Sequence, residues 1–454
     1  MTERREPPAR MGPRPLAVHL TTAIGVSMSS IAASAALRSG SIPWAADLRP
    51  EAAAIEAALQ ALERPPARKA AAEKAAPKKR RRRNEPPPNG RPDESPDPDA
   101  VRRAFAGAVQ RVEQRRLAAM LDGIERYRSH PYRRTLADPP AVWREGGARL
   151  LDFRALRRGS AKGAVLLTPS LVNRGYVLDL SERCSFARWL AQDGFDVFLM
   201  DWGAPGAEER SFALADVVAR LGRAAAAAAE AAGRPVGLLG YCMGGLLALP
   251  LAAGWLGPHP PIDRLVLLAA PWDFHAERAA QARALGATAQ LWAPAIAGLG
   301  VLPVDAIQAL FAALDPDLAP RKFAAFARMA PESARAHAFV ALEDWLNDGV
   351  PLPAAVAEEC LIGWYGENRP ARGGWRLGGF PVDPGAVGVP SLALAPAGDR
   401  IVPPASARAL AAAVPGCRLI EPEAGHIGMI VGASAPDRVW RPIADFLAER
   451  GDGA

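Results

Sequence analysis

The sequence predicts an α/β protein with a mostly parallel sheet that carries helices on both faces. Short runs of continuous apolar residues alternate with helical stretches over much of the chain. Between about 275 and 385 the alternation gives way to a long, Ala- and Leu-rich helical insertion. Continuous apolar runs flanked by helices are typical of parallel strands buried on both faces.

Six segments have the length and apolar content of buried strands. They are 163–168 (GAVLLT), 197–201 (VFLMD), 236–240 (VGLLG), 265–270 (LVLLAA), 391–395 (SLALA) and 418–421 (RLIE). Residues 212–232 carry a clear helical periodicity and connect the second of these strands to the third. The order of strands and helices therefore favours one doubly covered sheet.

Composition limits the classes of protein that this chain can be. Its 454 residues are 50% hydrophobic and 23% charged, which excludes a wholly disordered, collagenous or multi-span membrane protein. The net charge of +7 comes mainly from the first 100 residues, so we expect no specific nucleic-acid partner. Four cysteines without a CxxC pair exclude a disulfide scaffold and a zinc ribbon, and we expect neither a metal ion nor a bound cofactor.

Residues 1–100 are expected to form a mostly disordered basic tail, because 64–100 are rich in Pro, Ala and charge. Residues 15–37 carry no formal charge and predict a helix, either soluble or docked on a surface. Ser and Thr dilute this stretch, which argues against a transmembrane span, and an export signal is the alternative. The basic run 78–83 fits either a solvated linker or contact with an anionic polymer or surface.

The rest of the chain divides into three parts. Residues 101–160 are expected to form an N-terminal helical region, and 161–274 together with 385–454 form the α/β core. The insertion 275–384 is interpreted as a helical cap or lid over the carboxyl ends of the strands, where ligands bind in such sheets. Its apolar residues either line a substrate channel or only pack the cap on the core.

The hexapeptide GYCMGG follows the strand at 236–240 and precedes an apolar helix. It has the GxSxG form of a nucleophile elbow, in which the nucleophile occupies a sharp turn between strand and helix, and here it carries sulfur at Cys242. Gly240, Gly244 and Gly245 supply the small residues that this turn requires. Aligned amides at the start of the helix favour a thiolate, whereas the alternative is a buried structural cysteine.

An elbow of this kind is completed by an acid and then a histidine, each in a loop after a later strand. Asp399 follows the strand at 391–395, and His426 follows the strand at 418–421. Asp273 and Asp348 are weaker candidates for the acid, because neither immediately precedes the strand that leads to the histidine. We expect Cys242, Asp399 and His426 to act as nucleophile, orienting acid and base.

An oxyanion formed at this site needs two hydrogen-bond donors. The backbone N–H of Met243 directly follows the nucleophile, and we expect the second donor in the loop after 163–168, at Val172.

The sequence resembles the polyhydroxyalkanoate synthases through LLTPSLVNRGYVLDL, FLMDWG, LLGYCMGG, GDRIVPP and GHIGM. The family's Cys, Asp and His fall on Cys242, Asp399 and His426, and its backbone donor falls on Val172. The resemblance implies an α/β-hydrolase fold and the transfer of 3-hydroxyacyl groups from coenzyme A to the cysteine, then to the hydroxyl end of a polyester. It also implies a cytoplasmic enzyme whose candidate partners are the polyester granule surface, a second copy and a partner subunit.

Two other functions fit the same residues. Water instead of a hydroxyl acceptor would make the protein a thioesterase, esterase or polyester depolymerase. A granule-associated protein that is catalytically silent would keep the residues without the reaction.

Overall fold

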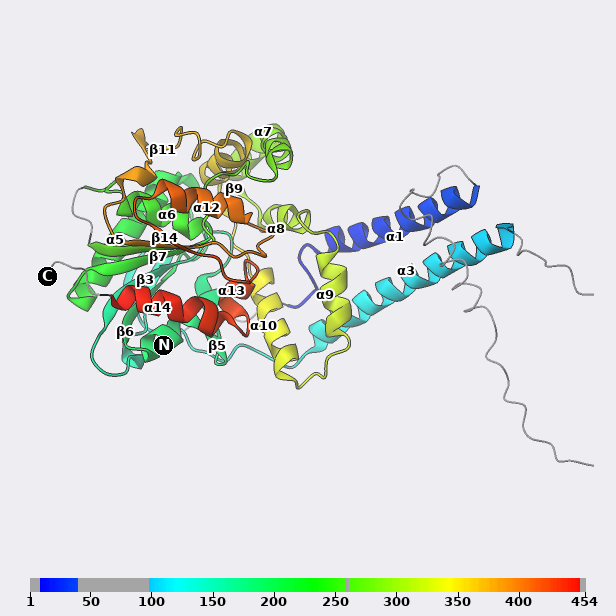
Figure 1. Cartoon of the computed structure of the whole chain (residues 1–454), viewed down its shortest axis with the longest axis horizontal. Coiled ribbons are helices and arrows are strands. Elements are labelled where there is room, and N and C mark those ends of the chain that lie inside the picture. The colour runs from blue at the N-terminus through cyan, green and yellow to red at the C-terminus, as the bar shows by residue number, and fades with distance from the viewer. Residues whose placement is uncertain (1–8, 40–97, 258–260, 450–454) are drawn as a thin grey trace, which may run out of the picture. The chain divides into compact units, whose positions relative to one another are not determined.

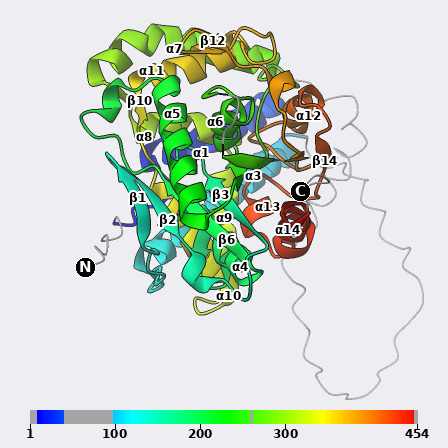
Figure 2. The same ribbon diagram turned by 90° about the vertical axis from the view of Figure 1, so that its left-hand side faces the viewer.

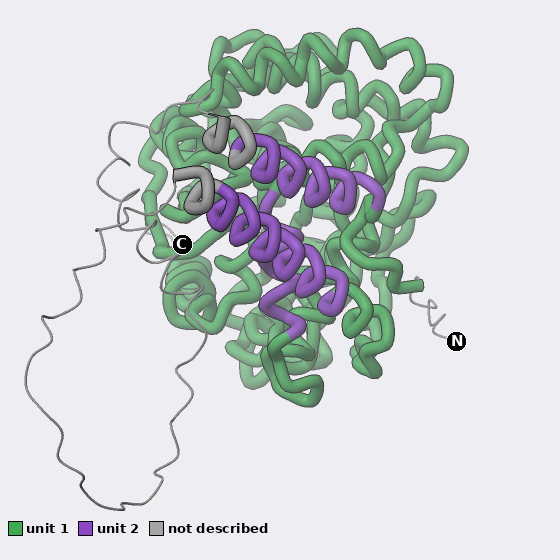
Figure 3. Tube along the Cα trace, turned by 90° about the vertical axis from the view of Figure 1, so that its right-hand side faces the viewer, with its two compact units in different colours: residues 1–16, 124–316, 328–454 green, residues 17–123, 317–327 purple. Residues whose placement is uncertain are grey.

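The computed structural model describes residues 9–39, 98–257 and 261–449. The expected disorder of the basic tail over 64–97 and the basic run 78–83 lie outside the described residues. The chain separates into two compact units, shown in Figure 3. One unit contains residues 1–16, 124–316 and 328–454, and the other contains 17–123 and 317–327.

The first unit is built on a central β-sheet, which Figure 1 shows. This sheet has eight strands in the order β1-β2-β6-β3-β7-β8-β13-β14. From β6 to β14 all neighbouring strands are parallel, whereas β2 pairs with both β1 and β6 in the antiparallel sense. The strands are β1 (Ala141–Glu145), β2 (Ala148–Asp152), β3 (Gly163–Thr168), β6 (Phe195–Asp201), β7 (Val236–Tyr241), β8 (Ile262–Leu268), β13 (Ser391–Leu394) and β14 (Arg418–Ile420). All six strands expected from the sequence are therefore present.

Helices and short turns join these strands. The core helices are α4 (Phe186–Gln192), α5 (Leu214–Ala232), α6 (Met243–Ala252), α12 (Pro404–Ala413), α13 (Gly428–Val431) and α14 (Arg441–Ala448). Shorter elements are η2 (Arg154–Leu156), η3 (Gly175–Leu178), η4 (Glu209–Ser211), η6 (Pro384–Ala386), the π-helix η7 (Pro436–Trp440), and the two-stranded pair β4 (Asp179–Ser181) and β5 (Cys184–Ser185).

Two hydrophobic clusters lie on opposite faces of the sheet, because successive side chains of a strand point to opposite sides. Leu166 and Leu238 belong to one cluster, which α5 and α6 cover. Leu167 and Leu239 belong to the other cluster, which α4 and α14 cover. The prediction of a mostly parallel sheet with helices on both faces is confirmed, and Figure 2 shows these layers from the side.

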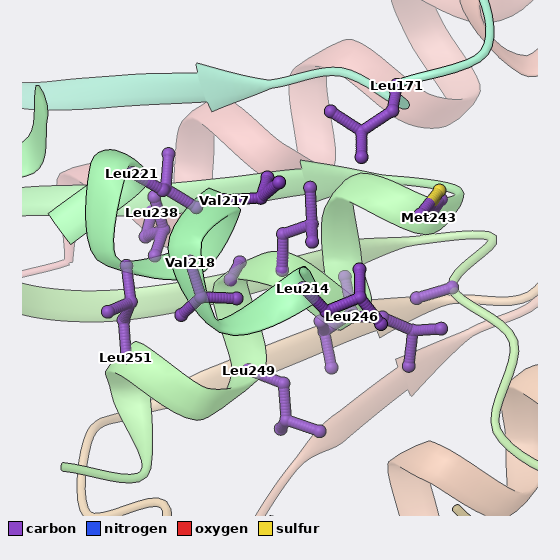
Figure 4. Packing of buried hydrophobic residues seen from close by; sticks show 14 of the residues in the cluster. Leu171, Leu214, Val217, Val218, Leu221, Leu238, Met243, Leu246, Leu249 and Leu251 are labelled. Carbon is purple, nitrogen blue, oxygen red and sulfur yellow. The ribbon is translucent and has the colours of Figure 1, made fainter. Parts of the chain in front are cut away.

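The helix α5 shows why the sequence forms this layer. Its buried residues recur at helical spacing, and Leu214, Val218 and Leu221 belong to the same hydrophobic cluster as Leu246 of α6 (Figure 4). The helix ends at Gly233, whose φ of 66° is the left-handed conformation that glycine adopts readily at a helix C-terminus. This packing holds α6, and with it the residue before α6, against the centre of the sheet.

The expectation of a helical region over 101–160 is only half right. The helix α3 (Pro98–Ser129) is followed by the hairpin of β1 and β2, which extends the sheet. Both strands are only partly buried and carry charged residues, so they lack the continuous apolar run of a central strand. The signal that predicts them is the Gly146-Gly147 pair between two short alternating segments, because such pairs are typical of two-residue hairpin turns.

Within the expected cap, the first unit contains α7 (Ala279–Leu299), α8 (Val304–Ala312), α10 (Ala334–Asn347), α11 (Ala354–Glu358) and the π-helix η5 (Glu359–Gly366). Two-residue ladders interrupt the helices, a feature that the sequence pattern does not predict. They join β9 (Val301–Leu302) to β10 (Leu352–Pro353) and β11 (Arg376–Leu377) to β12 (Phe380–Pro381).

The second unit contains most of α1 (Leu16–Ser39), most of α3 and the whole of α9 (Leu318–Phe326). Gly123 of α3 lies so close to α9 that a Cβ at this position would be 2.0 Å from the carbonyl oxygen of Phe323. By length and composition alone, residues 16–33 of α1 meet the criteria for a helix that crosses a membrane. An N-terminal signal sequence meets the same criteria. The helix predicted over 15–37 is therefore present as α1, but these criteria do not assign it a role.

Candidate active site

Cys242 lies at the turn between β7 and α6, at the carboxyl edge of the parallel strands. Its φ of 56° and ψ of −125° are unusual for a residue with a side chain, and such a conformation costs of order 1–3 kcal/mol. Two backbone bonds hold the turn, from the N–H of Cys242 to the carbonyl of Leu268 and from the N–H of Gly245 to the carbonyl of Cys242, at 2.8 and 2.9 Å. The surrounding chain therefore maintains the strain at the sulfur-bearing residue.

Three glycines allow the backbones to approach at this turn. A Cβ on Gly240 would lie 2.4 Å from the Cα of Gly245, and one on Gly245 would lie 2.4 Å from the Cβ of Ala270. A Cβ on Gly244 would lie 2.1 Å from the carbonyl oxygen of Thr168, the last residue of β3. Each position excludes any larger residue, as the elbow pattern requires.

Asp399 lies in the loop after β13, and its carboxylate is almost completely buried. Its Oδ1 accepts hydrogen bonds from the backbone N–H groups of Ile401 and Val402, at 2.8 and 2.9 Å. Its Oδ2 is 2.6 Å from Nδ1 of His426, which donates the hydrogen bond to the carboxylate. The loop backbone therefore fixes one oxygen and leaves the other for the imidazole.

His426 lies in the loop after β14 and is 7% exposed. The Asp399 loop supports this loop, because the N–H of Gly398 donates to the carbonyl of Ala424 at 3.0 Å. Tyr241, the last residue of β7, supports it from the other side. Its hydroxyl donates to the carbonyl of His426 at 3.1 Å, and the two rings stack with centroids 5.2 Å apart.

The charges at the site act on one another. Burial by itself lowers the pKa of His426, but negative charge on Cys242 and hydrogen bonds to Asp399 and Cys242 outweigh it and raise the pKa to about 10. Burial, followed by the charges of Cys242 and Asp399, raises the pKa of Tyr241 well above its usual value, so its hydroxyl stays protonated. The structure thus places His426 within hydrogen-bonding reach of both Asp399 and Cys242.

The two expected oxyanion donors lie on neighbouring segments. Met243 is the first residue of α6, and the N–H groups of a first helical turn have no partner within the helix. The loop after β3 passes over this turn, as the contact of Gly244 with Thr168 requires, and its Leu171 shares a hydrophobic cluster with Met243 (Figure 4). The N–H of Val172 makes a long contact of 3.4 Å with Oγ of Ser170.

The competing acids have other partners. Asp273 accepts hydrogen bonds from Nδ2 of Asn368 and from the N–H of His275, at 2.8 and 2.9 Å. Asp348 faces Arg174, with 3.6 Å between its Oδ1 and the guanidinium Nε. Both carboxylates therefore serve contacts between the core and the cap.

Sequence reasoning missed two tyrosines near the sulfur. Tyr241 directly precedes Cys242, so its position beside the candidate nucleophile was a usable signal. Tyr365 of η5 carries no such signal, because the fold brings it in from the cap. Burial raises its pKa, and the charges of Cys242 and Cys360 raise it further, so its hydroxyl stays protonated near the sulfur.

No group of three or more His, Cys, Asp or Glu side chains with the arrangement of a metal site occurs within residues 9–39, 98–257 and 261–449.

A family model described as alpha/beta hydrolase fold matches residues 164–433. This chain belongs to that family. The match begins in β3 and ends just after α13, so it includes the elbow at Cys242 and the loops of Asp399 and His426.

Several curated relatives carry the description poly(3-hydroxyalkanoate) polymerase subunit PhaC. That of Haloferax mediterranei is 28% identical over 68% of this chain and 64% of its own length, and that of Haloarcula marismortui is 28% identical over 64% of this chain and 62% of its own. That of Synechocystis sp. is 29% identical over 68% of this chain and 84% of its own. The chain thus matches less than two thirds of the length of the Haloferax and Haloarcula proteins. The resemblance to the polyhydroxyalkanoate synthases is confirmed by these relatives.

Proposed function

We propose that this protein is a polyhydroxyalkanoate synthase-like acyltransferase. It moves 3-hydroxyacyl groups from coenzyme A to Cys242 and from there to the hydroxyl end of a polyester. The observation that carries the proposal is a cysteine held in a strained elbow within reach of a buried imidazole, whose other nitrogen donates to Asp399 at 2.6 Å. The similarity to PhaC polymerase subunits supports the choice of substrate.

In the first step the sulfur of Cys242 attacks the thioester carbonyl of the acyl-CoA. His426 takes the thiol proton as the sulfur attacks, and Asp399, 2.6 Å from Nδ1, offsets the positive charge of the imidazole. A bond forms between the sulfur and the carbonyl carbon, and the tetrahedral oxyanion accepts hydrogen bonds from the N–H groups of Met243 and Val172. The bond to coenzyme A then breaks, and His426 gives its proton to the departing sulfur.

In the second step the hydroxyl group of the polyester chain attacks the acyl-cysteine. The now neutral His426 takes the hydroxyl proton as the new ester bond forms. The bond between the carbonyl carbon and the sulfur breaks, and His426 returns its proton to the sulfur of Cys242. Asp399 holds the N–H tautomer and offsets the positive charge of the ring through both steps.

Sulfur suits this sequence of transfers. Exchange between two thioesters changes the free energy little, so the acyl group stays activated on Cys242 for attack by an alcohol. The chemistry of the chain's own residues is sufficient, and we propose that the reaction uses no metal ion or bound cofactor. A chelator should therefore leave the rate unchanged.

We further propose a cytoplasmic enzyme that works at the surface of its polyester product. Acyl-CoA and the growing polyester are its proposed substrates. The exposed apolar residues of α1, among them Ile24 and Met28, are suited to an apolar surface.

The test is to give purified protein 3-hydroxybutyryl-CoA and to follow both coenzyme A and the acyl product. Release of coenzyme A with insoluble polyester supports the proposal, whereas release with free hydroxy acid identifies a hydrolase. Equal lack of release by the wild type and Cys242→Ala identifies a catalytically silent protein.

A further inference from the structure

Arg10 is one of the most completely bonded arginines in the described chain, although it lies in the segment that the sequence predicts to be a tail. Its side chain is 5% exposed. Its Nε and one terminal nitrogen donate to both carboxylate oxygens of Asp344, at 2.7 and 2.6 Å. Its terminal nitrogens also donate to the carbonyls of His130 and Tyr132, both at 2.6 Å. A two-pronged Arg–carboxylate pair fixes the relative orientation of the two side chains, whereas an ion pair on the exposed surface contributes little to stability.

The partner of Arg10 lies in the last turn of α10. The hydroxyl of Tyr127 donates to the same carboxylate of Asp344 at 2.9 Å and accepts from Nδ2 of Asn347 at 3.0 Å. Arg14 adds a backbone hydrogen bond to Oδ1 of Asn347, at 3.0 Å. The chain around residues 10–14 therefore ties down the carboxyl end of this cap helix.

The same end of α10 holds the loop that follows β3. The indole N–H of Trp345, next to Asp344, donates to the carbonyl of Arg174 at 2.7 Å. Beyond the helix, the N–H of Val350 donates to the carbonyl of Val172 at 3.0 Å. Asn173 forms an isolated bridge with Gly349. Three consecutive loop residues are thus bonded to the segment that Arg10 fixes.

We infer that Arg10 is a positioning residue for the oxyanion site. It fixes the end of α10, which in turn fixes the loop of residues 172–174 and the direction of the Val172 N–H. The carbonyl bonded to Val350 and the N–H proposed as the oxyanion donor both belong to Val172, so a movement of this residue changes the direction of that N–H. The catalytic consequence rests on the proposed acyl transfer, but the mechanical link from Arg10 to the loop does not.

The experiment compares Arg10→Ala and Arg10→Lys with the wild type. The matched control is Arg418→Ala, which removes another two-pronged arginine pair, to Glu449, with both side chains half exposed. Three quantities are measured on the full-length protein. They are amide hydrogen exchange over 170–176 and 344–350, the rate at which 3-hydroxybutyryl-CoA acylates Cys242, and the rate at which iodoacetamide alkylates Cys242, followed by peptide mass spectrometry.

For Arg10→Ala we expect faster exchange in both segments and acylation slowed about tenfold to a hundredfold, less than the loss of about 10²–10³ from deleting an oxyanion donor outright. Alkylation should change by less than about twofold, because it needs the thiolate but no oxyanion site. Arg10→Lys keeps the positive charge but cannot form the two-pronged pair with Asp344. Its exchange and acylation rates should therefore lie between those of Arg10→Ala and the wild type. Arg418→Ala should match the wild type in all three measurements.

Unchanged exchange over 170–176 in Arg10→Ala would overturn the inference, and so would equal losses of acylation and alkylation, which indicate general damage. If Arg10→Ala does not fold, Arg10→Lys decides by the same criteria. If the wild type is not acylated at all, the proposed function fails, while the exchange measurement still tests the link between Arg10 and the loop.

Discussion

The hydroxyl of Tyr241 donates a hydrogen bond to the carbonyl of His426 while the two rings stack 5.2 Å apart. The residue before the candidate nucleophile therefore holds the backbone of the candidate base. This bond joins the end of β7 to the loop after β14, which are 185 residues apart in the sequence.

Tyr241→Phe should keep the stacked ring but remove this bond. Because the carbonyl of His426 is then left without its buried donor, we expect a loss of about 1–3 kcal/mol in the free energy of unfolding. Turnover should fall more than alkylation of Cys242 does, since the histidine loop is held less firmly. Chemical denaturation and steady-state kinetics check both points, and an unchanged denaturation midpoint would contradict the first.

Replacing Cys242 separates its chemistry from its strain. Cys242→Ala and Cys242→Gly should both lose the acyl adduct that intact-mass spectrometry detects on the wild type. Since φ is 56° at this position, glycine relieves the strain that alanine keeps. We expect Cys242→Gly to be more stable than Cys242→Ala by about 1–2 kcal/mol in denaturant unfolding. Equal stability of the two variants would mean that the elbow stores no strain.

Asp399→Asn should preserve the fold and remove activity. An amide oxygen can still accept from the N–H groups of Ile401 and Val402, but its NH₂ group then faces Nδ1 of His426 and imposes the wrong tautomer. We expect turnover to fall by about 10⁴-fold, the loss that the same change causes in a Ser-His-Asp triad. Asp273→Asn is the matched control and should retain most activity. If Asp399→Asn is still active, a residue other than Asp399 must orient the histidine.

The charge of His426 predicts how stability depends on pH. Its folded pKa of about 10 is raised above the ordinary value of about 6.5. The stabilisation is therefore complete below about pH 6.5 and is lost progressively as the pH rises towards 10. Cys242→Ala removes the negative charge that raises the pKa of His426, so this part of the slope should shrink. Unfolding at a series of pH values, with NMR titration of the imidazole, measures both effects.

Gly244→Ala should prevent the elbow from closing, because the added Cβ would lie 2.1 Å from the carbonyl oxygen of Thr168. A backbone atom cannot move aside as a flexible side chain can, so we expect a loss of about 3 kcal/mol or more and no acylation. The control is Gly298→Ala in α7, where nothing lies within 4 Å of the new Cβ. That variant should be as stable as the wild type or gain up to about 1 kcal/mol, as thermal unfolding will show.

The sequence by itself determined the central strands and the residues at the candidate site. Continuous apolar runs mark buried parallel strands, and GYCMGG marks a sharp turn, because both depend on neighbours along the chain. Asp399 and His426 could be chosen from their places after successive strands, since the carboxyl ends of parallel strands meet at one edge of the sheet.

Only the tertiary structure decided how that site is supported. The hairpin of β1 and β2 is held in the sheet because β2 pairs with β6. The residues of the hairpin do not predict this pairing. Arg10 and Asp344 are 334 residues apart, and nothing local to either predicts the other. Such contacts depend on surfaces that exist only after the sheet and cap have packed. The candidate catalytic residues can therefore be identified from the sequence. The contacts that position them form only in the folded chain.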